Sequence, residues 1–225
     1  MNKRKVFVIG DSISIHYGPF LKNLLENDSE YDFEYDRKRG MEQALKDLDK
    51  PVGANGGDSN QVLEYLLEEK AKGIMYDLLL INCGLHDIRT DVKNGLRQVD
   101  SVIYEENLNK ICEISLGMAK KVIWVESTPV YDEVHNNLSK EMHRYKSDLE
   151  KYNQIAVKVM EVNSISIIYL YDFTDRYCPS AFYDHVHFKE EIRELQAAYI
   201  NVELKKILGI VPTENGIDCS GLSVW

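Results

Sequence analysis

VIGDSIS, residues 8–14, places Gly10-Asp11-Ser12 directly after the apolar run Val6–Ile9. An apolar run that ends in glycine and small polar residues is typical of a strand followed by a turn or a capped helix. Five segments predict strands. Four of them are nearly continuous apolar runs, which suits strands buried on both faces of a parallel sheet, whereas the second alternates between polar and apolar residues. The predicted strands are Lys5–Ile9, Asp32–Asp36, Leu78–Cys83, Val122–Glu126 and Ile165–Tyr171.

Amphipathic stretches alternate with these runs. Apolar residues recur at steps of three and four from Val62 to Leu67, from Leu108 to Met118, from Met142 to Val159 and from Phe188 to Val202, and each stretch predicts a helix. Strand and helix alternation predicts βαβ units and one three-layer α/β/α domain over residues 1–225, with a five-stranded, mostly parallel sheet. Residues 209–225 show no periodicity and are expected to form a C-terminal tail.

The composition disfavours several kinds of partner. The chain has 225 residues, a net charge of -10 and a pI of about 5.1, so a phosphate backbone or an anionic membrane surface would repel it. No run approaches the roughly 20 apolar residues that span a bilayer. The basic start MNKRK precedes an apolar run too short for a signal peptide, so a cytoplasmic protein is expected.

The four cysteines, Cys83, Cys112, Cys178 and Cys219, form no C-x-x-C pair. Cys83 ends an apolar run and Cys112 falls on an apolar helix face, so both are expected to be buried, unreactive thiols.

Polar residues follow the predicted strands at their C-terminal ends. In an open parallel sheet these ends meet along one edge, where ligands bind. Each segment alone has a simpler explanation, since Gly-Asp-Ser is a common turn, and Asp58 with Gln61 has the spacing of a helix capping box. Their joint placement favours one site. The segments are Gly10-Asp11-Ser12, Gly56-Gly57-Asp58-Ser59, Gly84-Leu85-His86-Asp87, Ser127-Thr128-Pro129 and the loop with Asp184 and His187.

Four of these segments, in this order, resemble the conserved blocks of the SGNH hydrolases, also called GDSL-type esterases. The matching positions are Gly10-Asp11-Ser12, Gly57, Gly84-Leu85-His86-Asp87 and Asp184-His185-Val186-His187. The resemblance extends from Val6 to about Leu208, and it implies a flavodoxin-like fold and hydrolysis of acyl esters. One position departs from the family pattern, because His86 stands where the third block has asparagine.

The chemistry of these residues supports the same expectation. A serine hydroxyl needs a base to become a good nucleophile, so Ser12 is the expected nucleophile and His187 the base. Asp184 would orient the His187 imidazole and stabilise its charged form. The backbone N–H groups of Ser12 and Gly57, with the imidazole of His86, would form the oxyanion hole. An acyl-enzyme on Ser12, cleared by water, requires no cofactor and no metal.

The residue beside His86 bears on its protonation. Asp87 is a candidate to fix the neutral tautomer of His86 or to raise its pKa.

Two other classes of function compete with the esterase. A metal-dependent phosphoesterase could use Asp11, His86, Asp87, His185 and His187 as ligands. Those enzymes open with an Asp-x-His ahead of the first block, which this chain lacks before Gly10. A non-catalytic sugar-binding module on the same scaffold is the third class, because a fold does not dictate a function.

The segment from Val130 to Tyr145 bears on the substrate. It follows the fourth predicted strand and is expected to overhang the site, and its Tyr, His, Asn and Arg residues suit a polar leaving group such as a sugar. A small ester, in particular an acetylated carbohydrate, is therefore the expected substrate. Lysophospholipases and thioesterases of the same family are the alternative.

Overall fold

The computed structural model describes residues 3–28, 33–35 and 55–210. Its main sheet has five strands in the order β2-β1-β3-β5-β7, and every pairing between neighbours is parallel. Counted along the sheet alone, this is the flavodoxin-like order 2-1-3-4-5, as expected. The strands are β1 (Arg4–Ile9), β2 (Phe33–Tyr35), β3 (Tyr76–Ile81), β5 (Ala119–Val125) and β7 (Ser166–Ile168).

β1 lies between β2 and β3 and leads directly into the Gly10-Asp11-Ser12 segment. Its register places Val6 opposite Leu78 and Ile9 opposite Ile81 of β3. Residues 6–9 are almost fully buried, because helices cover both faces of a parallel sheet. The chain therefore leaves β1 at Gly10 from a fixed position at the C-terminal edge.

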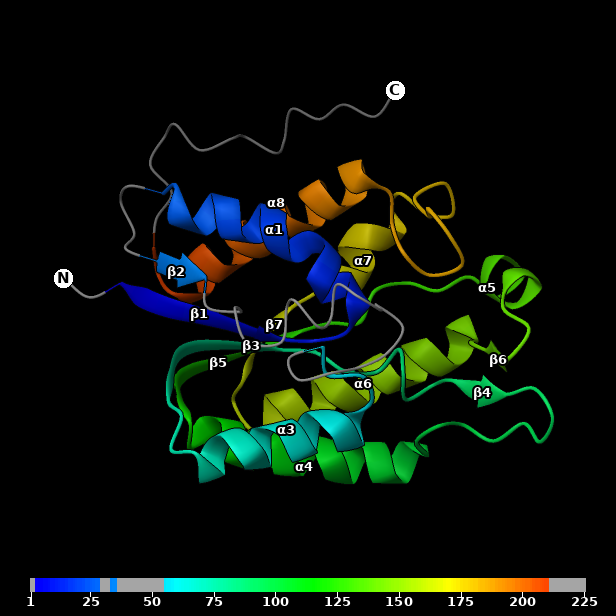
Figure 1. The fold of residues 1–225 in the computed structure, drawn as a ribbon, viewed down its shortest axis with the longest axis horizontal. Helices are drawn as coiled ribbons and strands as arrows, with labels where there is room; N and C mark the ends of the chain where they lie inside the picture. The colour runs from blue at the N-terminus through cyan, green and yellow to red at the C-terminus, as the bar shows by residue number, and fades with distance from the viewer. Residues whose placement is uncertain (1–2, 29–32, 36–54, 211–225) are drawn as a thin grey trace.

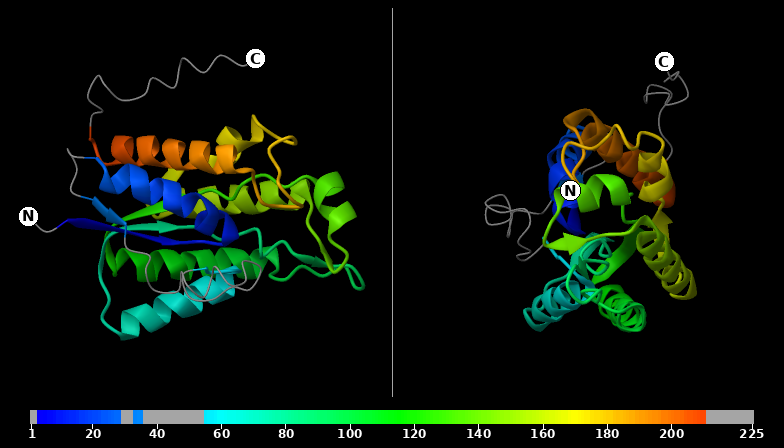
Figure 2. Two further views of the ribbon diagram at one scale, coloured as in Figure 1. Left: turned by 45° about the horizontal axis from the view of Figure 1, so that its top comes forward. Right: turned by 90° about the vertical axis from the view of Figure 1, so that its right-hand side faces the viewer.

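Helices form a layer on each face of the sheet. Figures 1 and 2 show α1 and α8 on one face, and α3 and α4 on the other. Figure 1 also shows α5, β4 and β6 beyond the C-terminal ends of the strands. The helices are α1 (Ser12–Glu26), α3 (Ser59–Ala71), α4 (Ser101–Leu116), α5 (Asp132–Leu138), α6 (Lys146–Val162), α7 (Leu170–Asp175) and α8 (Glu190–Ile207).

The last predicted strand is too long at its C-terminal end. β7 ends at Ile168 and α7 begins at Leu170, where the backbone N–H of Tyr171 donates to Glu126 Oε2 at 3.1 Å. An apolar run alone does not distinguish a buried strand from the start of a buried helix. The carboxylate of Glu126 at the end of β5 meets the first turn of α7 and decides between them.

The helix predicted from Met142 begins later. Met142 and His143 form β6, which pairs antiparallel with β4 (Thr90–Asp91), and α6 starts at Lys146. The N–H of Lys146 donates to the carboxylate of Asp132 at 2.7 Å, which fixes that start. The last helix likewise begins after Phe188. In both places tertiary contacts override the helical period.

Some expectations fall at the limits of the described residues. β2 confirms the middle of the second predicted strand, while Asp32 and Asp36 lie outside the described part, as do residues 211–225 of the expected tail. Cys83 and Cys112 are buried as expected, and burial raises the pKa of both thiols. Within the described ranges, no helix combines the length and apolar character needed to cross a bilayer.

Candidate active site

Ser12 is the first residue of α1, directly after the β1 turn. Asp11 caps this helix through a hydrogen bond from the N–H of Ile13 to its carboxylate (3.0 Å), as a short acidic side chain does at an N-cap. Ser14 Oγ donates to the carbonyl of Asp11 at 2.6 Å and lies so close that a Cβ on Gly10 would meet it at 2.9 Å. The tight turn therefore presents Ser12 at the helix N-terminus, where the backbone dipole favours negative charge.

His187 lies against Ser12. Its Nε2 is 2.8 Å from Ser12 Oγ, and its Nδ1 is 2.7 Å from Asp184 Oδ2. An ionised carboxylate only accepts hydrogen bonds, so the ring proton sits on Nδ1 and leaves the Nε2 lone pair facing the serine hydroxyl. This is the arrangement of a nucleophile, a base and an orienting carboxylate. The structure thus brings together the three residues expected to act in catalysis.

The carboxylate of Asp184 is held in its ionised form. Burial by itself would raise its pKa, but hydrogen bonds from the His187 ring and from the N–H groups of Val186 and His187 outweigh burial and keep the pKa well below its ordinary value. Oδ1 accepts the two backbone N–H bonds, and Oδ2 accepts the bond from the His187 ring. The loop itself therefore fixes the orientation of the carboxylate.

The expected backbone donor Gly57 lies beside the nucleophile turn. Asn55 pairs with Gly10 in a parallel bridge, and the N–H of Gly56 donates to the carbonyl of Gly10 at 3.0 Å. Gly57 follows with φ +70°, a left-handed conformation that glycine adopts without strain. The predicted capping box of Asp58 and Gln61 then starts α3. The backbone at Gly57 is thus buried between the nucleophile turn and a helix N-terminus.

His86 occupies a buried turn after β3. Burial lowers the pKa of its imidazole well below the ordinary value, and the nearby charges of Arg89 and Arg144 lower it further. His86 is therefore neutral at physiological pH and offers one N–H donor. The expectation that Asp87 could raise the pKa of His86 is wrong, because the shift is in the opposite direction.

Asp87 has its hydrogen-bond partner at the start of α3. Its Oδ1 accepts a hydrogen bond from the N–H of Ser59 at 2.9 Å, at the N-terminus of α3. Burial raises the pKa of Asp87 to about 7, although the bonds from Ser59 lower it. Among the described residues no hydrogen bond joins Asp87 to His86. Asp87 therefore ties the turn to α3 and does not fix the His86 tautomer.

The residues proposed as metal ligands have other partners. Asp11 caps α1, Asp87 accepts a hydrogen bond from Ser59, and the two ring nitrogens of His187 face Asp184 and Ser12. The ring of His185 packs edge-on against His135, with centroids 4.8 Å apart. In the part of the chain that the structure describes, no three His, Cys, Asp or Glu side chains are grouped to hold a metal ion.

The structure adds residues that the sequence did not single out. The ring of His16, one helical turn after Ser12, lies 4.8 Å from the ring of His187, and burial with the charge of Arg193 lowers its pKa to about 4. The i+4 spacing from Ser12 was a usable signal for His16. Asn82 donates to Val125 O (2.8 Å) and Ser127 Oγ (3.0 Å), which joins the ends of β3 and β5. No local pattern marks that contact.

Comparisons with solved structures place this fold among ester hydrolases. An α/β hydrolase enzyme from the metagenome of Lake Arreo, Spain, superposes with a TM-score of 0.65 at 15% identity, covering 95% of this chain and 99% of the other. A lipase/acylhydrolase from Enterococcus faecalis superposes with a TM-score of 0.60 at 18% sequence identity, and the match covers 91% of this chain and 96% of the other.

An acetyl xylan esterase, AlAXEase, superposes with a TM-score of 0.64 at 14% sequence identity, and the match covers 89% of this chain and 99% of the other. A member of the lipolytic protein G-D-S-L family from Veillonella parvula superposes with a TM-score of 0.62 at 15% sequence identity, and the match covers 90% of this chain and 98% of the other. No family model matches the sequence, and no curated protein matches it significantly. The three-layer sheet, its strand order and these superpositions show that the chain has the fold of the GDSL-type, or SGNH, lipases and esterases.

Proposed function

We propose that this protein is a serine esterase that hydrolyses small acyl esters, acetyl esters in particular. The observation that carries the proposal is the continuous hydrogen-bonded line from Ser12 Oγ through His187 to Asp184, with distances of 2.8 and 2.7 Å. A hydroxyl, an imidazole and a carboxylate in this order are the minimal machinery for acyl transfer. This line joins residues from the two ends of the chain. If each segment served only as a turn or a helix cap, the segments would have no reason to meet.

The reaction follows from these positions. Ser12 Oγ attacks the ester carbonyl carbon while His187 Nε2 takes the hydroxyl proton. The tetrahedral oxyanion accepts hydrogen bonds from the backbone N–H groups of Ser12 and Gly57 and from the imidazole of His86. The alcohol leaves with the proton from His187. Water, deprotonated by His187, then attacks the acyl-enzyme, and release of the acid regenerates Ser12.

The neutrality of His86 suits the role of oxyanion donor. A neutral imidazole donates one hydrogen bond in place of the amide N–H that the resembling family uses at this position. Because burial and two arginines keep the pKa of His86 low, its protonation state is constant over the working range of an esterase.

The leaving group is the finer part of the proposal, and we favour an acetylated carbohydrate. The polar residues of the 130–145 segment do not support this as expected, since His135, Asn136 and Arg144 bond to one another. A different residue supports it. Tyr183, beside Asp184, is 74% exposed, and its backbone N–H donates to the carbonyl of His187 at 2.7 Å. An exposed aromatic ring next to Asp184 in the chain can stack on a sugar ring.

Two experiments test the proposal. A fluorophosphonate should label the wild-type protein at Ser12, and a non-catalytic sugar-binding module would resist it. Aryl esters of rising chain length should then show the highest kcat/KM for acetate, whereas a maximum at long chains would favour a lysophospholipase or thioesterase. Activity that a strong chelator abolishes would instead favour the metal-dependent phosphoesterase.

A further inference from the structure

A buried arginine lies behind the candidate oxyanion turn. Arg144, which follows β6, is only 2% exposed. Its Nε donates to the backbone carbonyl of Leu85 at 2.6 Å, across 59 positions of sequence. Leu85 directly precedes His86, so this bond fixes the peptide plane from which the His86 side chain departs.

The other side of the guanidinium is held by His135. Arg144 Nη1 lies 2.6 Å from His135 Nε2, and because arginine only donates, Nε2 must accept. The ring proton is then on Nδ1, which donates to Asn136 Oδ1 at 3.0 Å. The same oxygen accepts the backbone N–H of Arg144 at 2.9 Å, which closes the network. Burial and the charge of Arg144 lower the pKa of His135 to about 3, in keeping with a neutral acceptor.

We propose that Arg144, held by His135, is a positioning residue that keeps the Gly84–Asp87 turn in the geometry in which His86 meets the oxyanion. The inference rests on the proposed function, in which His86 is an oxyanion donor. It assigns the 130–145 segment a role in catalysis that is separate from contact with the substrate.

The hydrogen bonds of the turn show why a side chain is needed. The carbonyls of Gly84, His86 and Asp87 accept backbone N–H groups from nearby residues at 3.1, 3.2 and 3.0 Å. The carbonyl of Leu85, also buried, receives its bond from Arg144 instead. A buried carbonyl that loses its donor carries a free-energy penalty, so the turn would rotate to find another partner. A displacement of about 1 Å at a catalytic group can lower a rate about a hundredfold.

The positive charge of Arg144 also favours the neutral, donating form of His86. Burial is the largest cause of the low pKa of His86, and the positive charges of Arg89 and Arg144 add to it. Arg144 therefore both orients the turn and helps keep His86 neutral, while its positive charge favours an oxyanion forming nearby.

A double-mutant cycle tests whether Arg144 acts through His86. Turnover of 4-nitrophenyl acetate is measured for the wild type, Arg144→Lys, His86→Ala and the double variant, with melting temperatures for all four. Arg144→Lys should lower kcat about tenfold with KM changed less than about twofold, and it should cost less than about twofold once His86 is alanine. Arg144→Met, which removes every guanidinium donor, should lose more than Arg144→Lys, because the lysine ammonium can still donate a hydrogen bond to the Leu85 carbonyl.

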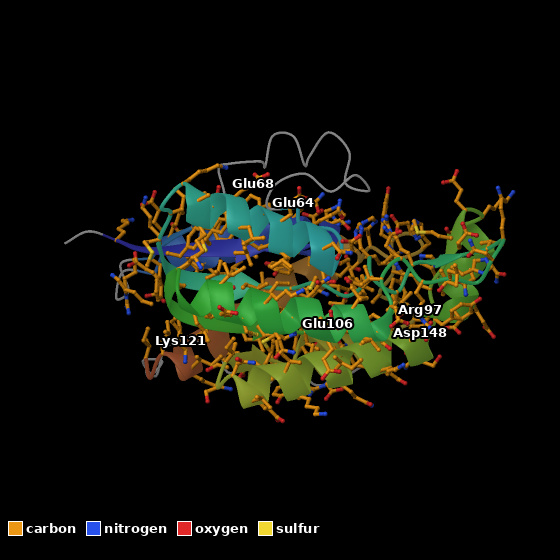
Figure 3. All side chains as sticks on the ribbon, turned by 90° about the horizontal axis from the view of Figure 1, so that it is seen from below. Glu64, Glu68, Arg97, Glu106, Lys121 and Asp148 are labelled. Carbon is orange, nitrogen blue, oxygen red and sulfur yellow. The ribbon has the colours of Figure 1, made fainter. Side chains whose placement is uncertain are left out.

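A matched control separates positioning from general stability. Arg97 binds Asp148 of α6 with two hydrogen bonds of 2.9 and 2.6 Å, at the surface seen in Figure 3. Arg97→Lys is the same chemical change away from the turn and should leave kcat within about twofold. Equal fractional losses from Arg144→Lys in the wild-type and His86→Ala backgrounds would overturn the inference, as would an unchanged kcat in the wild-type background. If the Ser12→Ala variant still hydrolysed the ester, the proposed function itself would be wrong.

Discussion

His187 Nε2 lies 2.8 Å from Ser12 Oγ, although 175 positions of sequence separate the two residues. Ser12 reaches this point at the end of β1, and His187 reaches it in the loop before α8, the helix that Figures 1 and 2 show beside α1. The packing of these two helices therefore brings the proposed nucleophile next to its proposed base.

The nucleophile is tested by removing one oxygen atom. Ser12→Ala should lower ester hydrolysis on the order of 10³-fold or more, because members of a triad act as a unit. Ser14→Ala is the control, because Ser14 Oγ donates to the backbone carbonyl of Asp11 and has no role in the proposed reaction, so this variant should still allow a fluorophosphonate to label Ser12. Near-normal turnover by Ser12→Ala would remove Ser12 from the mechanism.

The two histidines of the Asp184–His187 loop should differ sharply. His187 bonds to both Ser12 and Asp184, whereas His185 packs edge-on against His135. His187→Ala should therefore lose at least about a hundredfold more kcat than His185→Ala. Steady-state kinetics on one aryl acetate give the ranking, and the reverse order would transfer the role of base to His185.

The departure from the family pattern at His86 can be reverted. His86→Ala should slow acylation by roughly 10²–10³, the usual effect of deleting one oxyanion donor. His86→Asn should recover much of that loss, because an amide also donates an N–H. Pre-steady-state bursts with an activated acetyl ester measure the acylation rate directly. An alanine variant that acylates as fast as the wild type would make His86 structural.

Glu126 should make the protein less stable as the pH rises. Burial raises its pKa to about 7, although the hydrogen bond from the N–H of Tyr171 lowers it. The folded state then holds a proton that the unfolded chain, with a pKa of about 4.3, has already lost, so stability falls between about pH 4.5 and 7.

Glu126→Gln should raise the melting temperature at pH 8 and make the difference between pH 5 and pH 8 smaller. Asp87, whose pKa is also about 7, should keep part of the pH dependence. Thermal melts of both proteins at the two pH values decide this, and an unchanged pH dependence would mean that Glu126 ionises normally in the folded state.

Tyr183 tests the choice of leaving group. Tyr183→Ala should lower the ratio of kcat/KM on acetylated xylo-oligosaccharides to kcat/KM on 4-nitrophenyl acetate by about tenfold, mainly through KM, and Tyr183→Phe should keep the ratio. Tyr169, 44% exposed beside the edge strand β7, supplies the control Tyr169→Ala. The sugar assignment fails if Tyr183→Ala and Tyr169→Ala give the same ratio.

Much of the fold follows from patterns within short stretches of sequence. Continuous apolar runs and the amphipathic segments between them were enough to predict five mostly parallel strands and helices on both faces. The same holds for local parts of the site. Asp58 with Gln61, and Asp184 with His187, are each three residues apart, and the bonds that they form depend on little beyond the backbone that joins them.

The sequence by itself therefore determined the layers, the five strands of the sheet and the identity of the expected catalytic side chains, but not where every strand ends. Only the tertiary structure decided that Asp87 meets Ser59 in place of His86, that Thr90 pairs with His143, and that Arg144 holds the carbonyl of Leu85. The physical reason is the distance along the chain over which each interaction acts. Periodicity and capping act over a few residues, whereas the partner of a buried polar group is whichever donor or acceptor the packed helices and loops bring within hydrogen-bonding distance.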